Sequence, residues 1–172
     1  MALLEVNGLR LHYHGPAGPV RAVDGVSFSV AEGTALGVVG ESGSGKTSLA
    51  LALMRLLPRN LAHFSGQVLL EGVDCTALGA EEFRRLRWER LSMVFQGVME
   101  SFNPVLRVGD QIVEPLRQRG AGRQEAAARG RALLEAVTLP AQVFERYPHE
   151  LSGGMKQRAL IAMALVLRPR LV

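Results

Sequence analysis

Hydrophobic and polar positions alternate along the first thirty residues of the chain. In residues 4–13 the apolar side chains stand at every second position, with one slip at Asn7-Gly8, and residues 26–30 alternate in the same way. A period of two predicts half-buried strands of an antiparallel sheet, with a strand pair or a bulged strand at the slip. Residues 67–71 predict a further strand.

An unbroken apolar run at residues 35–39 departs from this alternation. Such a run predicts a strand buried on both faces, so a small antiparallel sheet should lie beside a parallel one. Residues 91–95 predict another strand, which ends at Gln96. Ligands of open α/β sheets bind at the carboxyl ends of the strands, which favours Gln96 as a site residue. A surface glutamine in a loop is the alternative.

Helical patterns account for most of the remaining chain. Residues 48–57 have leucine or methionine on nearly every side, which predicts a buried helix. Apolar side chains recur at helical spacing over residues 108–116, and a second helix is predicted at 124–137. No strand pattern occurs in residues 97–151, so this stretch is predicted as a helical insertion in an α/β core.

Glycines, a lysine and a hydroxyl at fixed spacing connect the apolar run to the first of these helices. The stretch reads Gly40-Glu41-Ser42-Gly43-Ser44-Gly45-Lys46-Thr47 and fits the pattern of a phosphate-binding loop. Glycines allow a tight loop whose N–H groups point inward, and the helix start adds a partial positive charge. Lys46 can then reach the β- and γ-phosphates of a nucleotide, and the Thr47 hydroxyl can hold Mg²⁺. The alternative is a glycine-rich turn that contains a lysine by chance.

A second motif, Leu151-Ser152-Gly153-Gly154, precedes another predicted helix. Ser152 can cap this helix, and the two glycines leave its first turn without side chains, so that its N–H groups can bind an anion. Taken alone, the same residues also fit a helix that is simply well capped.

Composition and charge restrict the function further. The chain has 172 residues and ordinary globular usage, which suits one domain with a substantial core. Its net charge of +4 is weak support for nucleic-acid binding, because basic and acidic residues interleave. Cys75 is the only cysteine, which excludes an intrachain disulfide and favours an inert packed side chain. No signal-peptide pattern is visible, and the longest apolar run, residues 159–167, is too short to span a bilayer, so we expect a cytoplasmic protein.

The two motifs, in this order and with a strand-end glutamine between them, identify a family resemblance. Leu151-Ser152-Gly153-Gly154 with Gln157 and Arg158 is similar to the signature motif of ABC-type ATPases, and the resemblance extends over the whole chain. Within this family, the chain resembles most the ATPase subunits of bacterial di- and oligopeptide (or nickel) importers. The stretches that match are residues 21–28, 40–47, 54–58 and 147–154.

This resemblance implies an α/β fold of the P-loop NTPase type, with an N-terminal antiparallel β part, an inserted helical subdomain and an incomplete C-terminal end. The implied division is residues 1–96 for the antiparallel part and the P-loop core, 97–157 for the helical subdomain and 158–172 for the return to the core.

The resemblance also implies the roles of individual residues. Those implied for ATP binding are Tyr13, Gly40, Glu41, Ser42, Gly43, Ser44, Gly45, Lys46, Thr47, Ser48 and Gln96. Tyr13 would stack on adenine, although it could instead be a strand residue that packs on the core. Thr47 and Gln96 would hold Mg²⁺. Leu151, Ser152, Gly153, Gly154 and Gln157 would bind the γ-phosphate of an ATP held by a facing subunit.

The partners implied are a second ABC ATPase subunit, identical or different, and transmembrane permease subunits. Through the permease the chain would lie on the inner face of the cell membrane, without inserting into the bilayer and without direct contact with nucleic acid. The transported solute depends on the permease, and this sequence does not name it.

The chain departs from the family pattern at several positions. Gly97-Val98 stand where the family usually has an acidic residue and proline, and Thr138 replaces a helix-ending glycine. The family's Mg²⁺-binding Asp, catalytic Glu and switch His have no counterpart in this sequence, so no catalytic residue is present. We expect the four histidines to be ordinary surface residues.

The interpretation is therefore an N-terminal fragment of an importer ATPase that binds ATP without hydrolysing it. One alternative is a non-catalytic nucleotide-binding module whose natural length is that of this chain. Another is an ABC-type ATPase head that acts on nucleic acid, which would call for a coiled-coil insertion or a basic stripe with interleaved aromatics, and the sequence shows neither.

Overall fold

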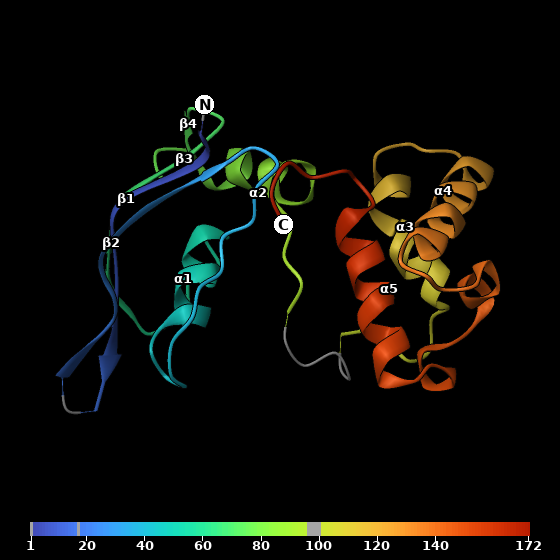
Figure 1. Cartoon of the computed structure of the whole chain (residues 1–172), viewed down its shortest axis with the longest axis horizontal. Coiled ribbons are helices and arrows are strands. Elements are labelled where there is room, and N and C mark those ends of the chain that lie inside the picture. Colours follow the sequence, from blue (N-terminus) through green and yellow to red (C-terminus); the bar gives the residue numbers. More distant parts are fainter. Residues whose placement is uncertain (1, 17, 96–100) are drawn as a thin grey trace. The chain divides into compact units, whose positions relative to one another are not determined.

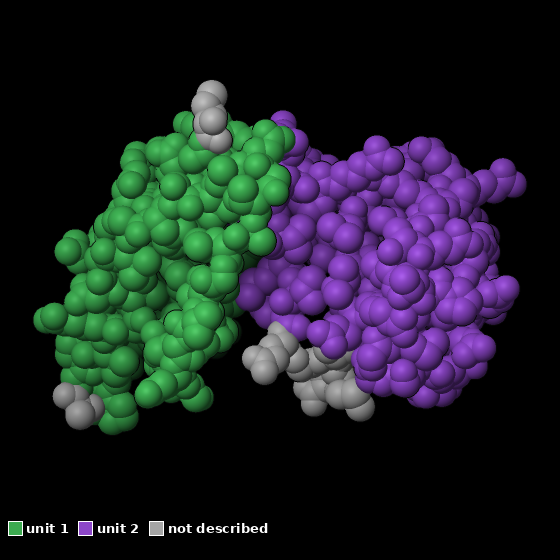
Figure 2. Space-filling model, in the orientation of Figure 1, with its two compact units in different colours: residues 1–84 green, residues 85–172 purple. Residues whose placement is uncertain are grey.

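A computed structural model describes residues 2–16, 18–95 and 101–172 of the chain (Figure 1). The chain divides into two compact units, Met1–Arg84 and Arg85–Val172 (Figure 2). The first contains an antiparallel sheet and a short helix, and the second is helical. The subdomain boundaries expected from the family resemblance stay a prediction.

The sheet of the first unit has four strands in the order β2-β1-β3-β4, and all neighbours are antiparallel. The strands are β1 (Ala2–Gly15), β2 (Gly18–Ala31), β3 (Leu61–Leu70) and β4 (Val73–Asp74). The alternation over residues 4–13 is confirmed, because Leu4, Val6, Leu9 and Leu11 are all buried. The predicted slip is also confirmed, since the register of β1 shifts between Val6 and Leu9 against both of its neighbours.

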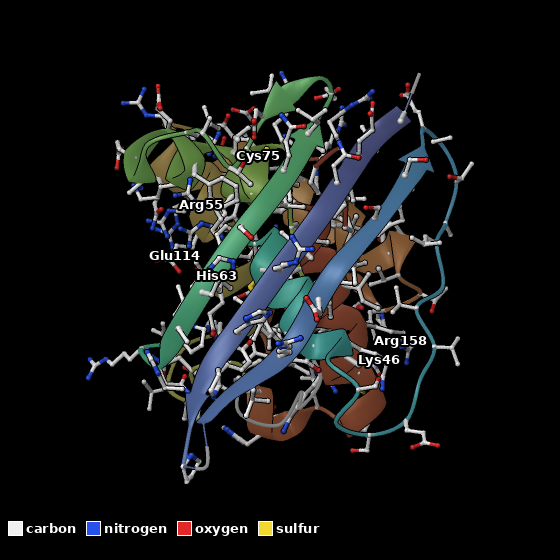
Figure 3. The ribbon with its side chains drawn as sticks, turned by 90° about the vertical axis from the view of Figure 1, so that its left-hand side faces the viewer. Lys46, Arg55, His63, Cys75, Glu114 and Arg158 are labelled. Carbon is white, nitrogen blue, oxygen red and sulfur yellow. The ribbon has the colours of Figure 1, made fainter. Side chains whose placement is uncertain are left out.

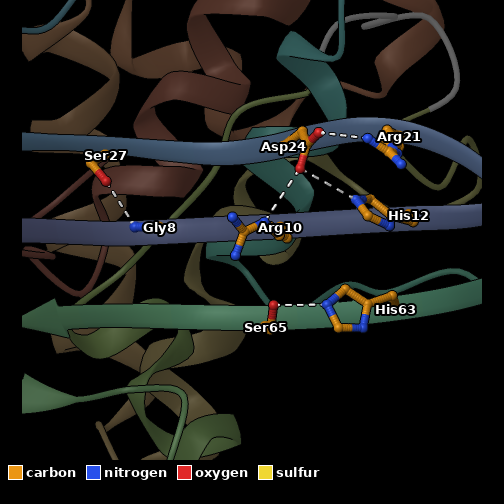
Figure 4. Close-up of polar contacts among 8 residues, drawn as sticks. All are labelled: Gly8, Arg10, His12, Arg21, Asp24, Ser27, His63 and Ser65. Atoms are coloured by element: carbon orange, nitrogen blue, oxygen red, sulfur yellow. Dashed lines mark hydrogen bonds and ion pairs between the residues drawn. The ribbon is translucent and has the colours of Figure 1, made fainter.

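One face of the sheet carries a cross-strand cluster of charged side chains (Figure 4). Asp24 on β2 pairs with Arg10 at 3.3 Å, with Arg21 at 3.5 Å and with His12 at 3.7 Å. The Arg10, Arg21 and Asp24 side chains are largely solvated, so each of the two Arg–Asp pairs contributes little to stability, about 1 kcal/mol or less. His63 on β3 lies beside His12, with 5.2 Å between the ring centroids.

Three of the four histidines are exposed, as expected for surface residues: His14, His63 and His149. His12 differs, because its side chain is only 18% exposed.

Asp74 at the end of β4 is the acceptor of a hydrogen-bonded turn. Its carboxylate accepts hydrogen bonds from the Thr76 hydroxyl at 2.5 Å, from the Thr76 amide at 2.9 Å and from Gln67 at 2.9 Å. The hydrogen bond from the Thr76 side chain, followed in size of effect by the one from Gln67, lowers the pKa of Asp74 below its ordinary value. Cys75 beside it is buried, as predicted, and burial raises the pKa of its thiol.

Helix α1 (Lys46–Leu53) covers the other face of the sheet (Figure 3). The predicted helix over 48–57 is correct in type but wrong in extent, because α1 begins two residues earlier and ends four residues earlier. Its C-terminus is a Schellman motif, in which Leu56 N–H bonds Leu51 O and Arg55 N–H bonds Ala52 O. Arg55 occupies the position with positive φ, 48°, that usually holds glycine.

The prediction that this helix is buried on nearly every side is also wrong. Only Leu49 and Ala52 within α1 are buried, and its other side chains are half-buried or exposed.

The apolar run at residues 35–39 does not form the predicted strand. It has no regular structure, and Leu36, Val38 and Val39 are 48%, 50% and 96% exposed. A strand buried on both faces requires hydrogen-bonded neighbours, and none of the described residues pairs with this segment. The strand predicted at 91–95 is likewise reduced to isolated parallel bridges at Leu91, which pairs with Arg87 and with Leu171 within the second unit.

The second unit is built from helices, as the sequence predicted. Helix α2 (Ala80–Glu89) crosses the division between the units and is interrupted at Arg87 and Trp88. The remaining elements are α3 (Val108–Gln118), α4 (Arg123–Ala136), the short 3₁₀ helices η2 (Ala141–Glu145) and η3 (Pro148–Glu150), and α5 (Gly153–Leu165). No strand occurs in residues 101–151, which agrees with the predicted helical insertion.

Phe144 of η2 lies at the centre of the packing between α3 and α4. A Cβ on Gly109 of α3 would lie 2.3 Å from its ring, and a Cβ on Gly130 of α4 would lie 2.7 Å from it. Only glycine permits this approach at both helices.

Within the described part of the chain, no helix is long and apolar enough to cross a membrane.

Candidate functional site

The glycine loop before α1 folds around the ammonium group of Lys46. The Lys46 Nζ donates hydrogen bonds to Gly40 O at 2.7 Å and to Glu41 O at 2.6 Å, and it lies 3.4 Å from Ser44 Oγ. These are exposed contacts at the first residue of α1 (Figure 3). The loop therefore holds one positive charge at the N-terminus of a helix, where the macrodipole also favours an anion.

Gly45 fixes the loop against the sheet. Its φ is 92°, and a Cβ at this position would lie 2.0 Å from the carbonyl oxygen of Ala22 on β2. Any other residue would have to displace the strand backbone. Gly45 is also the N-cap of α1 and provides no side-chain cap, and the first intrahelical bond runs from Leu49 N–H to Gly45 O. The N–H groups of the first turn therefore have no acceptor within the helix, which leaves them available to an anion.

Thr47 and Ser48 complete the loop on the first turn of α1. The Thr47 side chain is exposed and forms no hydrogen bond with the described residues. A free hydroxyl one residue after the lysine of the loop is the kind of oxygen ligand that Mg²⁺ takes, so Thr47 fits the predicted metal role. Gln96, the other predicted Mg²⁺ ligand, lies outside the described residues, as do Gly97 and Val98.

Tyr13 lies near the end of β1 and is half-buried. It is paired with Val20 on β2 and with Leu61 on β3. Ala22, which contacts Gly45, lies two residues along β2 from Val20. From the spacings of strands and residues in a sheet, the Tyr13 backbone is within about 10 Å of the point where the loop meets the sheet.

The second motif forms the start of α5 in the helical unit. Ser152 is the N-cap, and its Oγ accepts a hydrogen bond from Met155 N–H at 3.3 Å, as predicted. Gly153 and Gly154 are exposed, and a Cβ on either would meet nothing within 4 Å. Leu151 is buried and anchors the motif in the core of this unit. The first turn of α5 therefore presents bare backbone, and Gln157 follows it as an exposed side chain.

Arg158 holds this helix start in place, a role that the sequence did not reveal. Its Nη1 donates to both the carbonyl and the hydroxyl of Thr138 at 2.9 Å, and its Nε donates to Gly154 O at 3.4 Å. Thr138 has a φ of 59°, in the left-handed region where a helix end usually holds glycine. The only sequence signal for this contact was the presence of Thr138 at the end of α4 and of a basic residue, Arg158, seven positions after Leu151.

The two motifs belong to different units, the glycine loop to Met1–Arg84 and the serine-capped helix to Arg85–Val172. A glycine loop closed around a lysine at a helix start is the characteristic arrangement of the P-loop class of folds, and the second unit adds a serine-capped helix with two exposed glycines.

Comparison with known proteins gives the family. The model of the ABC transporter family matches residues 23–172, and the chain belongs to this family. Curated relatives include the oligopeptide transport ATP-binding protein OppD of Salmonella typhimurium, 44% identical over 99% of this chain and 51% of its own length. A probable peptide ABC transporter ATP-binding protein of Sinorhizobium fredii is 42% identical over 99% of this chain and 52% of its own length. The chain thus spans about half the length of these relatives.

The fold is also that of solved ATP-binding cassettes. A dimeric post-hydrolysis structure of the cassette MJ0796, bound to ADP and phosphate, superimposes with a TM-score of 0.84 at 25% identity. The match covers 96% of this chain and 70% of that one. The P-loop α/β fold class expected from the sequence is therefore confirmed, although the described residues form only its antiparallel and helical parts.

Proposed function

We propose that this chain is the ATP-binding part of an ABC importer that couples ATP binding and hydrolysis to the uptake of peptides. The observation that supports ATP binding most directly is the loop around Lys46, pinned to β2 at Gly45. Peptides are the solute named for the relatives, and nickel is the alternative from the family resemblance.

The loop residues suit the binding of a nucleotide triphosphate. Lys46 donates to the β- and γ-phosphates, the N–H groups of the loop and of the first turn of α1 contact the same oxygens, and Thr47 holds Mg²⁺ together with Gln96. Bound Mg²⁺ would offset the charge of the β- and γ-phosphates. Tyr13 stacks on adenine at the edge of the sheet.

The start of α5 suits the γ-phosphate of an ATP bound by a second subunit. Its backbone is bare at Gly153 and Gly154, and Ser152 offers a hydroxyl on the same turn. In a head-to-tail dimer, each ATP would lie between the glycine loop of one subunit and this helix of the other. The chain would associate with permease subunits on the inner face of the membrane.

Hydrolysis needs a carboxylate for the metal and a group that orients the attacking water. The family positions for these groups have no counterpart in this sequence, so the 172-residue chain is expected to bind ATP and leave it intact. Turnover of about 1 s⁻¹ or more, above the level of Lys46→Ala, would contradict this expectation.

The binding proposal is tested by calorimetry of the purified chain with Mg²⁺ and either ATP or AMP. AMP lacks the two phosphates that the loop contacts, so ATP should bind tenfold or more tightly, an order-of-magnitude estimate for one charge-assisted contact of about 2 kcal/mol. Equal affinities for ATP and AMP would contradict a phosphate-loop site.

A further inference from the structure

A hollow lined by arginines lies in the helical unit, among α3, α4 and η2. Its volume is about 150 Å³. The charged side chains that line it are Arg107, Asp110, Arg117, Arg123, Arg131 and Glu145. Four guanidinium groups against two carboxylates leave an excess of positive charge, so the hollow favours an anion.

Two of these arginines are held in place by the protein itself. Glu145 accepts a hydrogen bond from Arg107 at 2.5 Å on one oxygen and from Arg131 at 2.8 Å on the other. The Arg131 guanidinium also lies over the ring of Phe144, 4.5 Å from its centroid. Because glycines of α3 and α4 enclose this ring, the floor of the hollow is rigidly packed.

The other two arginines have no such partners. The guanidinium groups of Arg117, in the last turn of α3, and of Arg123, at the start of α4, form no hydrogen bond or ion pair with the described residues. Both are exposed, and both line the hollow. Asp110 lines it too, but it makes no ion pair with them in the described part of the chain. Two guanidinium groups that share a hollow repel each other unless an anion lies between them.

We propose that this hollow binds a phosphate group, with Arg117 and Arg123 as its direct ligands and Arg131 beside them. Guanidinium groups match phosphate oxygens with paired hydrogen bonds, and such contacts are strong. A single water needs only about 10–15 Å³ of such space, so a hollow of about 150 Å³ has room for a group of several heavy atoms, such as phosphate. The site is separate from the glycine loop and does not depend on the proposed ATP binding.

The phosphate can belong to a soluble phosphate compound or to the headgroup of an anionic phospholipid. Both present the same oxygens to the arginines. The two sources differ in the experiment, because only the second brings the chain to a bilayer.

The test uses the Lys46→Ala chain, which removes the main charge of the glycine loop and leaves the hollow intact. Inorganic phosphate is titrated into it by NMR and calorimetry. In this background, Arg117→Gln with Arg123→Gln should weaken phosphate binding tenfold or more. The matched control is Arg129→Gln with Arg146→Gln, which removes two positive charges of the same unit outside the hollow and should leave binding unchanged.

A second arm measures co-sedimentation with phosphatidylcholine vesicles, with and without phosphatidic acid. Loss of phosphatidic-acid-dependent binding in the hollow variant, but not in the control, would assign the phosphate to a lipid. Loss of free phosphate binding alone would assign it to a soluble compound. Equal behaviour of the two variants in both arms would overturn the proposal. ATP binding by the chain with native Lys46 reports separately on the proposed function.

Discussion

Replacing Lys46 with alanine should weaken ATP binding by removing the charge at the centre of the glycine loop. In the free chain, the ammonium group donates to Gly40 O at 2.7 Å and to Glu41 O at 2.6 Å. A lysine has three N–H donors. The third contact, to Ser44 Oγ, is 3.4 Å long, beyond the usual length of a hydrogen bond.

One donor is therefore available to a phosphate oxygen while the two carbonyl contacts persist. A hydrogen bond to a charged group contributes about 1.5–3 kcal/mol. Losing this hydrogen bond should raise the dissociation constant for ATP roughly 10- to 150-fold. The binding of adenosine, which has no phosphate, should not change.

Calorimetry of the two chains with ATP and Mg²⁺ measures this ratio. The matched control is Lys156→Ala, because Lys156 is the only other lysine and lies on α5. Thermal unfolding of each variant checks that the loop change leaves the unit folded. Equal ATP affinity for Lys46→Ala and the parent chain, with both folded, would refute the phosphate-loop assignment.

Three further predictions concern the first unit. Tyr13→Ala should cost about 1–3 kcal/mol of ATP affinity if the ring stacks on adenine, whereas Tyr13→Trp should cost little; two variants that lose stability but keep affinity would show a core residue instead. Gly45→Ala should lower both stability and ATP affinity far more than Gly43→Ala, because both glycines have positive φ but only Gly45 meets the Ala22 carbonyl; equal urea midpoints would exclude that contact. The hydrogen bonds to Asp74 lower its pKa, so their stabilising effect is present above the unfolded-state pKa and is lost as the pH falls through the folded-state pKa. Urea unfolding between pH 7 and pH 3 should thus show a smaller acid loss for Asp74→Asn than for the parent chain.

Features set by nearby residues could be predicted from the sequence. The alternation over residues 4–13 and its slip appear as a half-buried strand with a register shift, because a period of two is a local property. The helices over 108–116 and 124–137 appear as α3 and α4, and Ser152 caps α5. The glycine loop lies where its spacing placed it, at the start of α1.

Features that depend on distant partners could not be predicted. The apolar run over 35–39 has the composition of a buried strand, but pairing is decided by neighbours that are not adjacent in sequence, and no described residue supplies them. The end of α1 depends on Arg55, whose guanidinium donates to Leu78 O at 2.7 Å and lies over the ring of Phe83. These contacts hold Arg55 at a positive φ, which residues other than glycine rarely adopt.

The candidate site shows the same division. The identity of Lys46 and its spacing to the glycines were legible in the sequence, whereas the contact of Gly45 with Ala22 joins residues on separate elements. The arginine hollow combines residues from α3, α4 and η2, spread from Arg107 to Glu145, and no local pattern marks it.

The seating of Phe144 between α3 and α4 has a consequence for the order of folding. Gly130 and Phe144 are only 14 positions apart, so the helical unit can begin its central contact through a local encounter. The sheet differs, because β1 and β3 meet through pairs as far apart as Leu4 and Leu70. Closing such a loop costs more chain entropy and slows the search for the right partner. During synthesis, the β1–β2 hairpin can form early, but β1 keeps its second edge open until β3 has emerged.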